Sequence, residues 1–312
     1  MRSKSRGSSQ CFNRKEMKML GKSLLVINPR AGTGKAKNAL LDIVMRISDF
    51  GGIVTVLPTK PGDETIGFLK EHATEYDTVI ACGGDGTLSL TVEGLIVSSS
   101  KANLGFIPMG STNDFSLSMK IPSNYRKATD AMLSGFPVPL DIGTFNGRHF
   151  CYIAACGLFV DSSYTTSQSL KNILGHAAYL LNALPSLAGL RPVRLHVEVN
   201  DCVYDGAYAL CAFTNSTSAA GVIRFDGNQI NFNDGLFELI LIRMPDDLAA
   251  ASRIAAKLLS GNMADDCITV IHANKVRVLS EQAVGWSIDG ENGGKRTEAV
   301  LTVEKSAVRL LK

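Results

Sequence analysis

The chain has 312 residues, of which 45% are hydrophobic and 20% charged, and its formal net charge is +3. This length and composition allow a sizeable buried core and favour two domains over one. The first 22 residues carry seven Lys or Arg and one Glu, so the remaining chain has a net charge of −3. That mildly acidic body argues against a nucleic-acid-binding protein. The apolar runs are too short to span a bilayer, and none follows the N-terminal charges as a secretory signal requires.

The seven cysteines are scattered and form no Cys-x-x-Cys pair. This usage is typical of buried thiols in a reducing compartment, so we expect a cytoplasmic protein. The basic head, residues 1–21, has two interpretations that stay open. It is either an arm that contacts an anionic membrane surface, or a solvated, disordered tail or an upstream start-codon artefact, because Met17 and Met19 directly precede the first expected strand.

Strands and helices alternate through the first half of the chain. Strands are expected at 22–28, 52–57, 77–82 and 103–107, and helices at 36–50, 62–75 and 88–99. The alternation predicts an α/β domain with a parallel sheet at 22–138.

The second half has a different pattern. Asn146-Gly147 and Asn200-Asp201 each lie between two β-type runs, which is typical of a hairpin. Further strands are expected near 236–243, 268–272, 275–280, 284–288, 298–303 and 307–311, and helices at about 168–184 and 247–259. These elements predict a mainly antiparallel β-sandwich domain at 139–312, whose last strands could return to the first domain.

Three glycine-rich loops follow strands of the first half. They are "NPRAGTGK" at 28–35, "GGDGT" at 83–87 and "GSTND" at 110–114. Loops that follow parallel strands share one edge of the sheet, and each of these loops opens a helix whose free amide groups attract anions. The sequence therefore predicts a phosphate-binding edge.

Neither common mononucleotide motif is present. Pro29 and Ala36 occupy positions that a Walker A loop would fill with other residues, and Ser89 stands where a dinucleotide fingerprint needs glycine. Asp85, inside the central loop, could bind Mg²⁺, orient a water or accept a hydroxyl proton. The alternative is that Asp85 only caps the following helix.

The ordered motifs "INPRAGTGKA", "TKPGD", "GGDGTL", "GSTNDF", "NDGLFEL" and "IDGE" resemble those of the bacterial diacylglycerol kinase-like lipid kinases, relatives of sphingosine kinases. The resemblance covers nearly all of residues 22–312. It implies a fold like that of NAD kinase and phosphofructokinase, and an ATP- and Mg²⁺-dependent transfer of phosphate to a lipid hydroxyl. The residues it assigns to ATP are Asn28, Pro29, Arg30, Ala31, Gly32, Thr59, Gly83, Gly84, Asp85, Gly86, Thr87, Leu88, Ser89 and Ser111.

The chain departs from the family pattern in two places. Ser89-Leu90 replace the usual Asn-Glu pair, and Glu93, one helical turn further on, is a candidate to replace the lost acid. Ser116-Leu117 stand where a small residue and Arg are usual, which removes a cation near the site.

Two acidic motifs in the second half carry further implications. In "NDGLFEL" the resemblance implies a magnesium site with the Asp234 side chain and the carbonyls of Asn231 and Leu236, although an Asp-Gly turn alone would explain the motif. In "IDGE" it assigns Glu291 as proton acceptor, with Asp289 and Asp85 as competing candidates.

The acceptor is expected to be a lipid with a free hydroxyl, reached by transient contact with a membrane. The aliphatic segments 151–160 and 173–190 either line an apolar cleft for acyl chains or pack in an ordinary core. A homodimer stays open. The alternative functions are an NAD kinase-like enzyme, or a catalytically weak regulator that binds nucleotide or lipid.

Overall fold

The computed structural model describes residues 20–60, 63–157, 192–219, 223–224 and 230–312. The head up to residue 19, the predicted helix at 168–184 and the segments 158–160 and 173–190 therefore lie outside the described residues. None of the helices within these ranges is long and apolar enough to cross a membrane.

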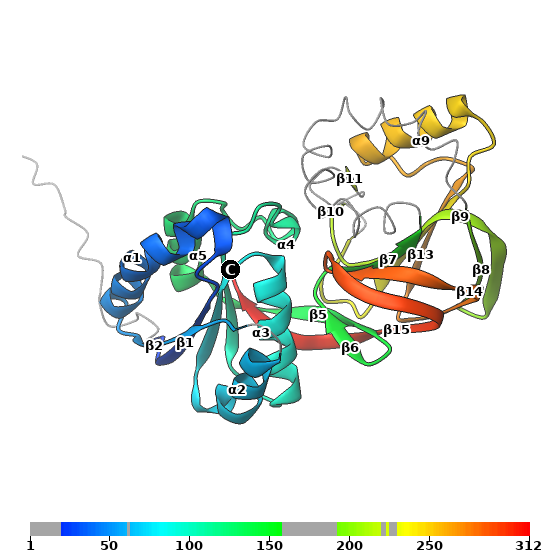
Figure 1. The fold of residues 1–312 in the computed structure, drawn as a ribbon. Helices are drawn as coiled ribbons and strands as arrows, with labels where there is room; N and C mark the ends of the chain where they lie inside the picture. Colours follow the sequence, from blue (N-terminus) through cyan, green and yellow to red (C-terminus); the bar gives the residue numbers. More distant parts are fainter. Residues whose placement is uncertain (1–19, 61–62, 158–191, 220–222, 225–229) are drawn as a thin grey trace, which may run out of the picture.

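A four-stranded parallel sheet organises the first half of the chain (Figure 1). Its strands are β1 (Lys22–Ile27), β2 (Ile53–Pro58), β3 (Thr78–Gly83) and β4 (Asn103–Pro108), and they lie in the order β4-β3-β1-β2. β1 and β3 are almost continuously buried because helices cover both faces of the sheet. The predicted α/β architecture is confirmed.

Helices cover both faces of this sheet. They are α1 (Lys35–Asp49), α2 (Glu64–His72), α3 (Asp85–Val97), α4 (Asp114–Ser118) and α5 (Tyr125–Ser134), with short 3₁₀ turns at Ala31–Gly34 and Ala73–Glu75. α1 and α5 share one apolar cluster, and α2 and α3 share another on the opposite face. α3 begins at Asp85, three residues before the predicted start at 88, because Gly84 is extended and ends the loop.

The second half is mainly antiparallel, as predicted. Within the described residues its strands are β5 (Pro137–Phe145), β6 (Arg148–Phe150), β7 (Ile153–Gly157), β8 (Val193–Val199), β9 (Cys202–Thr214), β10 (Ser218–Ala219), β11 (Ile223–Arg224), β12 (Phe237–Arg243), β13 (Ile268–Ala273), β14 (Lys275–Ile288) and β15 (Glu291–Leu311), and the helix α9 spans Leu248–Ser260. Aromatic side chains, among them Phe150, Phe213, Phe237 and Trp286, fill its core.

Both predicted hairpins form. Asn146 and Gly147 have φ values of 48° and 85°, and Asn200 and Asp201 have 48° and 61°, as a two-residue left-handed turn requires. The strands expected at 275–280 and 284–288 are one long strand, β14, and those at 298–303 and 307–311 are parts of β15, because irregularities in register bend each strand without ending it.

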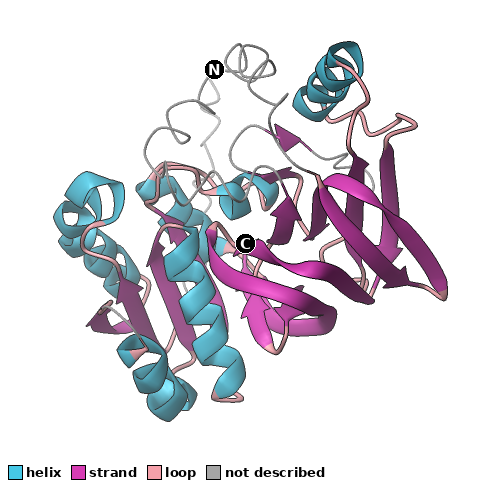
Figure 2. Ribbon diagram, turned by 45° about the vertical axis from the view of Figure 1, so that its right-hand side comes forward, coloured by secondary structure: helices cyan, strands magenta, loops and turns pink. Residues whose placement is uncertain are grey.

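β15 connects the two halves. It pairs with β14 and β5 in the second half, and its Leu310 pairs in parallel with Leu104 of β4. The described strands therefore form one hydrogen-bonded sheet of 13 strands and a separate pair, β10 with β11 (Figure 2). This continuous sheet fixes the acidic turns of the second half relative to the loops of the first.

Candidate active site

The three glycine-rich loops meet at one edge of the parallel sheet. A Cβ atom on Gly84 would lie 3.2 Å from the Cα atom of Gly110, and one on Gly32 would lie 2.8 Å from the carbonyl oxygen of Met109. The loops are thus in close backbone contact, which a side chain at Gly32 would prevent and one at Gly84 would strain. The predicted convergence of the loops is confirmed.

The first loop follows β1 and turns sharply. Gly32, Thr33 and Gly34 all have left-handed φ values, of 59°, 57° and 89°, and the Asn28 side chain accepts a hydrogen bond from the Arg30 amide at 3.0 Å. Thr59 follows the neighbouring strand β2, and its amide donates to the carbonyl of Ile27 at 2.8 Å. Thr59 therefore lies at the same sheet edge as the first loop.

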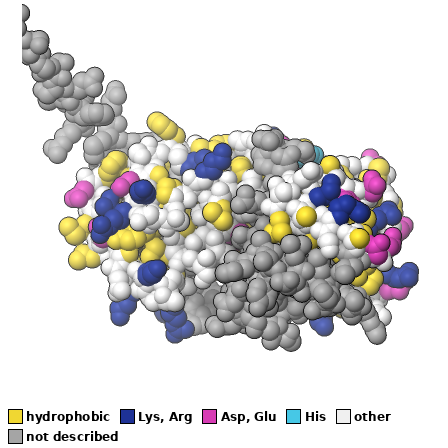
Figure 3. Space-filling view, turned by 90° about the horizontal axis from the view of Figure 1, so that it is seen from above, with side chains coloured by type: hydrophobic (Ala, Val, Ile, Leu, Met, Phe, Trp, Pro, Cys, Tyr) yellow, Lys and Arg dark blue, Asp and Glu magenta, His cyan; other side chains and the backbone are white. Residues whose placement is uncertain are grey.

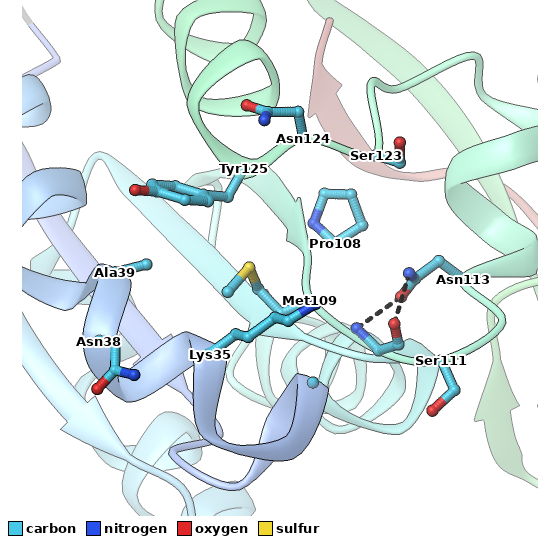
Figure 4. A pocket seen from close by; sticks show the side chains of 12 residues that line it. Lys35, Asn38, Ala39, Pro108, Met109, Ser111, Asn113, Ser123, Asn124 and Tyr125 are labelled. Atoms are coloured by element: carbon cyan, nitrogen blue, oxygen red, sulfur yellow. Dashed lines mark hydrogen bonds between the residues drawn. The ribbon is translucent and has the colours of Figure 1, made fainter.

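A cavity of about 610 Å³ opens between the first loop, the third loop and α5 (Figure 4). Lys35 and Ser111 border it from the two loops. Asn113 closes the third loop: its side chain accepts from the Gly110 amide at 2.8 Å and donates to the Gly110 carbonyl at 2.9 Å. The cavity offers space and one positive side chain beside the loops.

The N-terminus of α3 points its free amide groups at this edge. Gly84 is the N-cap residue and no side chain caps the helix. The amides of Thr87 and Leu88 donate to the Gly84 carbonyl, while the first two amides of a helix have no intrahelical acceptor. With the positive end of the helix dipole, these groups suit a phosphate.

The Asp85 carboxylate reaches across to α4 and does not cap its own helix. It accepts from the Thr112 hydroxyl and from the Phe115 amide, both at 3.4 Å. Burial, helped by the nearby carboxylate of Asp114, raises the pKa of Asp85 to about 6. Asp85 is therefore mostly ionised at pH 7 and is held there at an energetic cost.

Asp114 is a functional candidate that the sequence analysis missed. It is buried, it begins α4, and its carboxylate accepts from the Ser218 hydroxyl of the second half at 3.3 Å. The "GSTND" motif contains it, but the motif was interpreted only for its backbone and Ser111. Asp85 and Asp114 together offer hard oxygen donors of the kind that suit a divalent cation.

Glu291 approaches the central loop from the second half. Its Oε1 atom lies 3.2 Å from where a Cβ atom on Gly86 would be, so the carboxylate lies over the first turn of α3. Asp289, two residues earlier, is buried, and its two carboxylate oxygens accept four hydrogen bonds. The geometry therefore favours Glu291 over Asp289 as a proton acceptor.

Three residues of the central helix have contacts within the protein. Leu88 is fully buried in the core, and its amide donates to the Gly84 carbonyl within the helix. The Ser89 hydroxyl donates to Asp289. Glu93 does not replace the missing acid of the loop, because its carboxylate accepts from both the backbone amide and the imidazole Nδ1 of His149, at 3.1 and 2.9 Å.

The predicted magnesium loop has donors of suitable chemistry. Asn231 and Asp234 are exposed, and the Asp234 carbonyl accepts from the Lys305 ammonium at 3.1 Å, so the loop already turns one oxygen toward a cation. The Asp234 side chain accepts from the Leu236 amide at 2.9 Å. No group of three or more His, Cys, Asp or Glu side chains within the described ranges could hold a metal ion, so this site would rely on carbonyl oxygens beside one carboxylate.

Asp141 anchors this loop, and the sequence analysis missed its role. It is fully buried, and its carboxylate accepts from the amides of Gly235 and Ser306, each at 2.6 Å. The sequence does contain an indication of this role: Asp141 is the one acid within the apolar run "PVPLDIG". A buried, ionised side chain needs hydrogen-bond donors around it.

The described part of the expected lipid-lining segments, residues 151–157, packs in the core. Cys151 and Tyr152 belong to the first-half core, and Ala154 and Cys156 belong to the core of the second half. The structure thus favours ordinary core packing for this part.

Two family models match the chain. The diacylglycerol kinase catalytic domain matches residues 22–145, and the YegS C-terminal NAD kinase beta sandwich-like domain matches residues 160–312. Together they cover the parallel sheet with its loops and most of the antiparallel half.

Relatives match over nearly the full length. The chain is 32% identical to a diacylglycerol kinase of Bacillus subtilis (strain 168) over 273 residues, covering 86% of this chain and 89% of that protein. It is 30% identical to a diacylglycerol kinase of Staphylococcus epidermidis over 289 residues, covering 92% and 91%. A crystal structure from Bacillus anthracis (strain Sterne) has the same fold, with a TM-score of 0.82 at 23% identity over 96% of this chain and 98% of that one. On these matches, the chain belongs to the diacylglycerol kinase catalytic domain family.

Proposed function

We propose that the protein is a lipid kinase that transfers the γ-phosphoryl group of ATP to the hydroxyl of a diacylglycerol-like lipid. The observation that carries the proposal is the position of Glu291 over Gly86. It brings an acid from the second half to the helix end that suits a phosphate. Membership of the family supports ATP as the phosphate donor.

The chain's own residues would divide the reaction as follows. The amides at the start of α3 and the loops at Gly32 and Ser111 would bind the phosphates of ATP. Glu291 would take the proton from the lipid hydroxyl, whose oxygen then forms a bond to the γ-phosphorus. The bond from that phosphorus to the β–γ bridging oxygen breaks, and ADP leaves. Such transfer depends mainly on positioning and charge neutralisation, with a base adding about 10²–10⁴-fold.

Magnesium has two candidate places in this account. Asp85 and Asp114 would hold an ion beside the nucleotide, and the Asn231, Asp234 and Leu236 loop would hold another. Bound Mg²⁺ neutralises charge on the transferred phosphoryl group. The Asp141 carboxylate joins the Asn231–Leu236 loop to β15. An ion in that loop would therefore stabilise the fold and take no part in the reaction.

The lipid is proposed to be reached by transient contact with a membrane. Leu117 on α4, near the site, is 54% exposed and could contact lipid. On the face shown in Figure 3, the Lys and Arg side chains lie in small separate groups. Because the chain after residue 22 has a net charge of −3, any electrostatic attraction to anionic lipid would come mainly from the basic head.

A lipid panel tests the proposal. Purified protein with labelled ATP and Mg²⁺ is offered diacylglycerol, phosphatidylglycerol or a sphingoid base in mixed micelles, and NAD in a parallel arm. We expect label in the organic phase with at least one lipid, and none with the Glu291→Gln variant. No labelled lipid from the wild-type protein would contradict the proposal, and NADP formation would favour an NAD kinase.

A further inference from the structure

We propose that Ser89 and Asp289 form an interdomain latch that positions Glu291 over α3 for catalysis. The inference rests on the proposed function, because it assigns the latch to the proton acceptor of that reaction. Asp289 and Ser89 are then positioning residues, and Glu291 alone would touch the substrate.

The Asp289 carboxylate is saturated with donors. Its Oδ1 atom accepts from the amides of Tyr152 and Ile153, at 3.0 and 3.1 Å. Its Oδ2 atom accepts from the Cys151 amide and from the Ser89 hydroxyl, both at 2.6 Å. A carboxylate has about four lone-pair sites, so Asp289 could bind a further proton only by losing one of these donors. Its chemistry is that of an anchor.

Asp289 and Glu291 are separated only by Gly290, in a tight turn. Ile288 and Glu291 are paired residues of β14 and β15, so Asp289 and Gly290 are the two residues of the connecting turn. Their φ values are 49° and 80°, as a type I′ turn requires. Asp289 also donates its own amide to the Ile153 carbonyl at 2.8 Å. The hydrogen bonds of the Asp289 amide and of its carboxylate therefore fix the position of the Glu291 backbone.

Ser89 extends this anchor to the nucleotide half. Its hydroxyl, on α3, lies 2.6 Å from the Asp289 carboxylate, 200 residues away in the sequence, and 3.0 Å from the Asp85 carbonyl within the helix, so the shorter contact is the one to Asp289. Ser89 lies three residues after Gly86, so both residues are on one face of the helix. Glu291 thus approaches α3 at Gly86 and Asp289 approaches it one turn further on. The two contacts set both the distance and the direction of the acid relative to the phosphate-binding end.

The latch predicts a specific kinetic effect. Without the Ser89 hydroxyl, Asp289 keeps its three amide donors, so the fold should persist while Glu291 loses its fixed distance from α3. A displaced proton acceptor costs turnover, and a misplacement of about 1 Å can cost on the order of 10²-fold. Nucleotide binding uses the loops and should change little.

The test compares Ser89→Ala with two variants that restore a donor, Ser89→Thr and Ser89→Asn. Ser98→Ala is the matched control, because its hydroxyl bonds the Leu95 carbonyl within the same helix, far from the turn. We expect Ser89→Ala to lower kcat about 10- to 100-fold with the KM for ATP within about twofold. At least one donor variant should regain most of kcat, and Ser98→Ala should match the wild type.

A second measurement separates the latch from the proposed reaction. Amide hydrogen exchange at residues 151–153 and 289–291 should become at least about tenfold faster in Ser89→Ala than in Ser98→Ala. Absence of any lipid phosphorylation by the wild type would overturn both the proposed function and the catalytic role of the latch. If exchange in Ser89→Ala were still faster in that case, the contact between Ser89 and Asp289 would be structural only. Unchanged exchange in Ser89→Ala, or a kcat within twofold of the wild type, would overturn the latch itself. If Ser89→Ala fails to fold, the Ser89→Thr and Ser89→Asn variants test the latch instead. A folded variant that keeps a donor but has no activity would contradict the inference.

Discussion

The carboxylate of Glu291 lies against the α-carbon side of Gly86, with Oε1 3.2 Å from the place a Cβ atom would occupy. The contact joins the hairpin turn of the second half to the first turn of the helix that follows the central glycine-rich loop. In the proposed function, this is where the proton acceptor and the phosphate would meet.

This contact predicts the effect of Gly86→Ala. The added methyl group would press on Glu291, and we expect kcat to fall at least about tenfold. The free energy of unfolding should not fall, because alanine in a helix is favoured over glycine by up to about 1 kcal/mol. Gly67→Ala in α2 is the matched control, since its Cβ would have nothing within 4 Å. Equal kcat values for the two variants would contradict the position assigned to Glu291.

The raised pKa of Asp85 predicts how activity depends on pH. If Asp85 must be ionised to organise the nucleotide, kcat/KM should fall as the pH drops below about 6, the pKa that burial and then Asp114 produce. Asp114→Asn removes the like charge, so the acid limb of its profile should move to lower pH. An acid limb that stays in place would mean that another group controls it.

The same pKa makes a prediction about stability. Burial, and after it the charge of Asp114, raise the folded-state pKa of Asp85 above the ordinary aspartate value of 3.8, so the folded protein loses stability as the pH rises from about 4 to about 6. Asp85→Asn avoids this cost, and its free energy of unfolding at pH 8 should exceed that of the wild type by about 1–3 kcal/mol, while its activity is lost. Denaturant unfolding of the two proteins at pH 8 and pH 4 measures the difference in stability. An Asp85→Asn variant that is less stable than the wild type at pH 8 would contradict the cost assigned to Asp85.

His149 should stabilise the junction between the two halves in a pH-dependent way. Its imidazole lies between the carboxylates of Glu93 and Glu304, at 2.9 and 3.3 Å, and the hydrogen bond with Glu93 raises its pKa. Burial alone would raise the pKa of Glu93, but the bond with His149 holds it below the usual value. The folded pKa of His149 is raised, so its contribution to stability is complete below the ordinary imidazole pKa of 6.5 and is lost as the pH rises through the folded pKa. The folded pKa of Glu93 is lowered, so its contribution to stability is lost as the pH falls through that folded pKa.

We therefore expect His149→Gln to destabilise the protein by about 1–3 kcal/mol at pH 6 and by less at pH 9. Urea unfolding at the two pH values measures the difference. His72→Gln is the control, because His72 also bonds a glutamate but its side chain is 41% exposed. A loss that does not shrink at pH 9 would show that His149 acts by packing alone.

The magnesium loop can be tested without an activity assay. If Asp234 supplies the carboxylate of a structural ion, Mg²⁺ should raise the melting temperature of the wild-type protein, and Asp234→Ala should abolish that shift. Asp266→Ala, which removes another exposed acid, should retain it. An equal shift in all three proteins would place the ion elsewhere.

Local patterns in the sequence predicted much of the fold. The alternation of strands and helices predicted the parallel sheet, and parallel strands necessarily bring loops 28–35, 83–87 and 110–114 to one edge. Asn146-Gly147 and Asn200-Asp201 predicted their hairpins because few residues accept left-handed φ values. The breaks expected within β14 and β15 were wrong, since a strand can bend at an irregular register without ending.

The roles of the acids could not be predicted in the same way, because they depend on partners far away in the sequence. Asp289 is saturated by donors at 89 and 151–153, Glu93 is paired with His149, and Asp141 is held by donors at 235 and 306. Only the folded sheet brings these groups together. Leu88 was assigned to ATP by its place in a motif, although its side chain lies on the buried face of α3.

The most direct test of the account is the turnover of Glu291→Gln and Asp289→Asn, measured with a lipid acceptor alongside the affinity of each variant for ATP. The account predicts that Glu291→Gln lowers kcat by about 10²–10⁴-fold with ATP affinity within about twofold. It predicts a smaller loss of kcat for Asp289→Asn, accompanied by faster amide exchange at residues 151–153. A Glu291→Gln variant that keeps the wild-type kcat would contradict the central claim that this carboxylate accepts the proton.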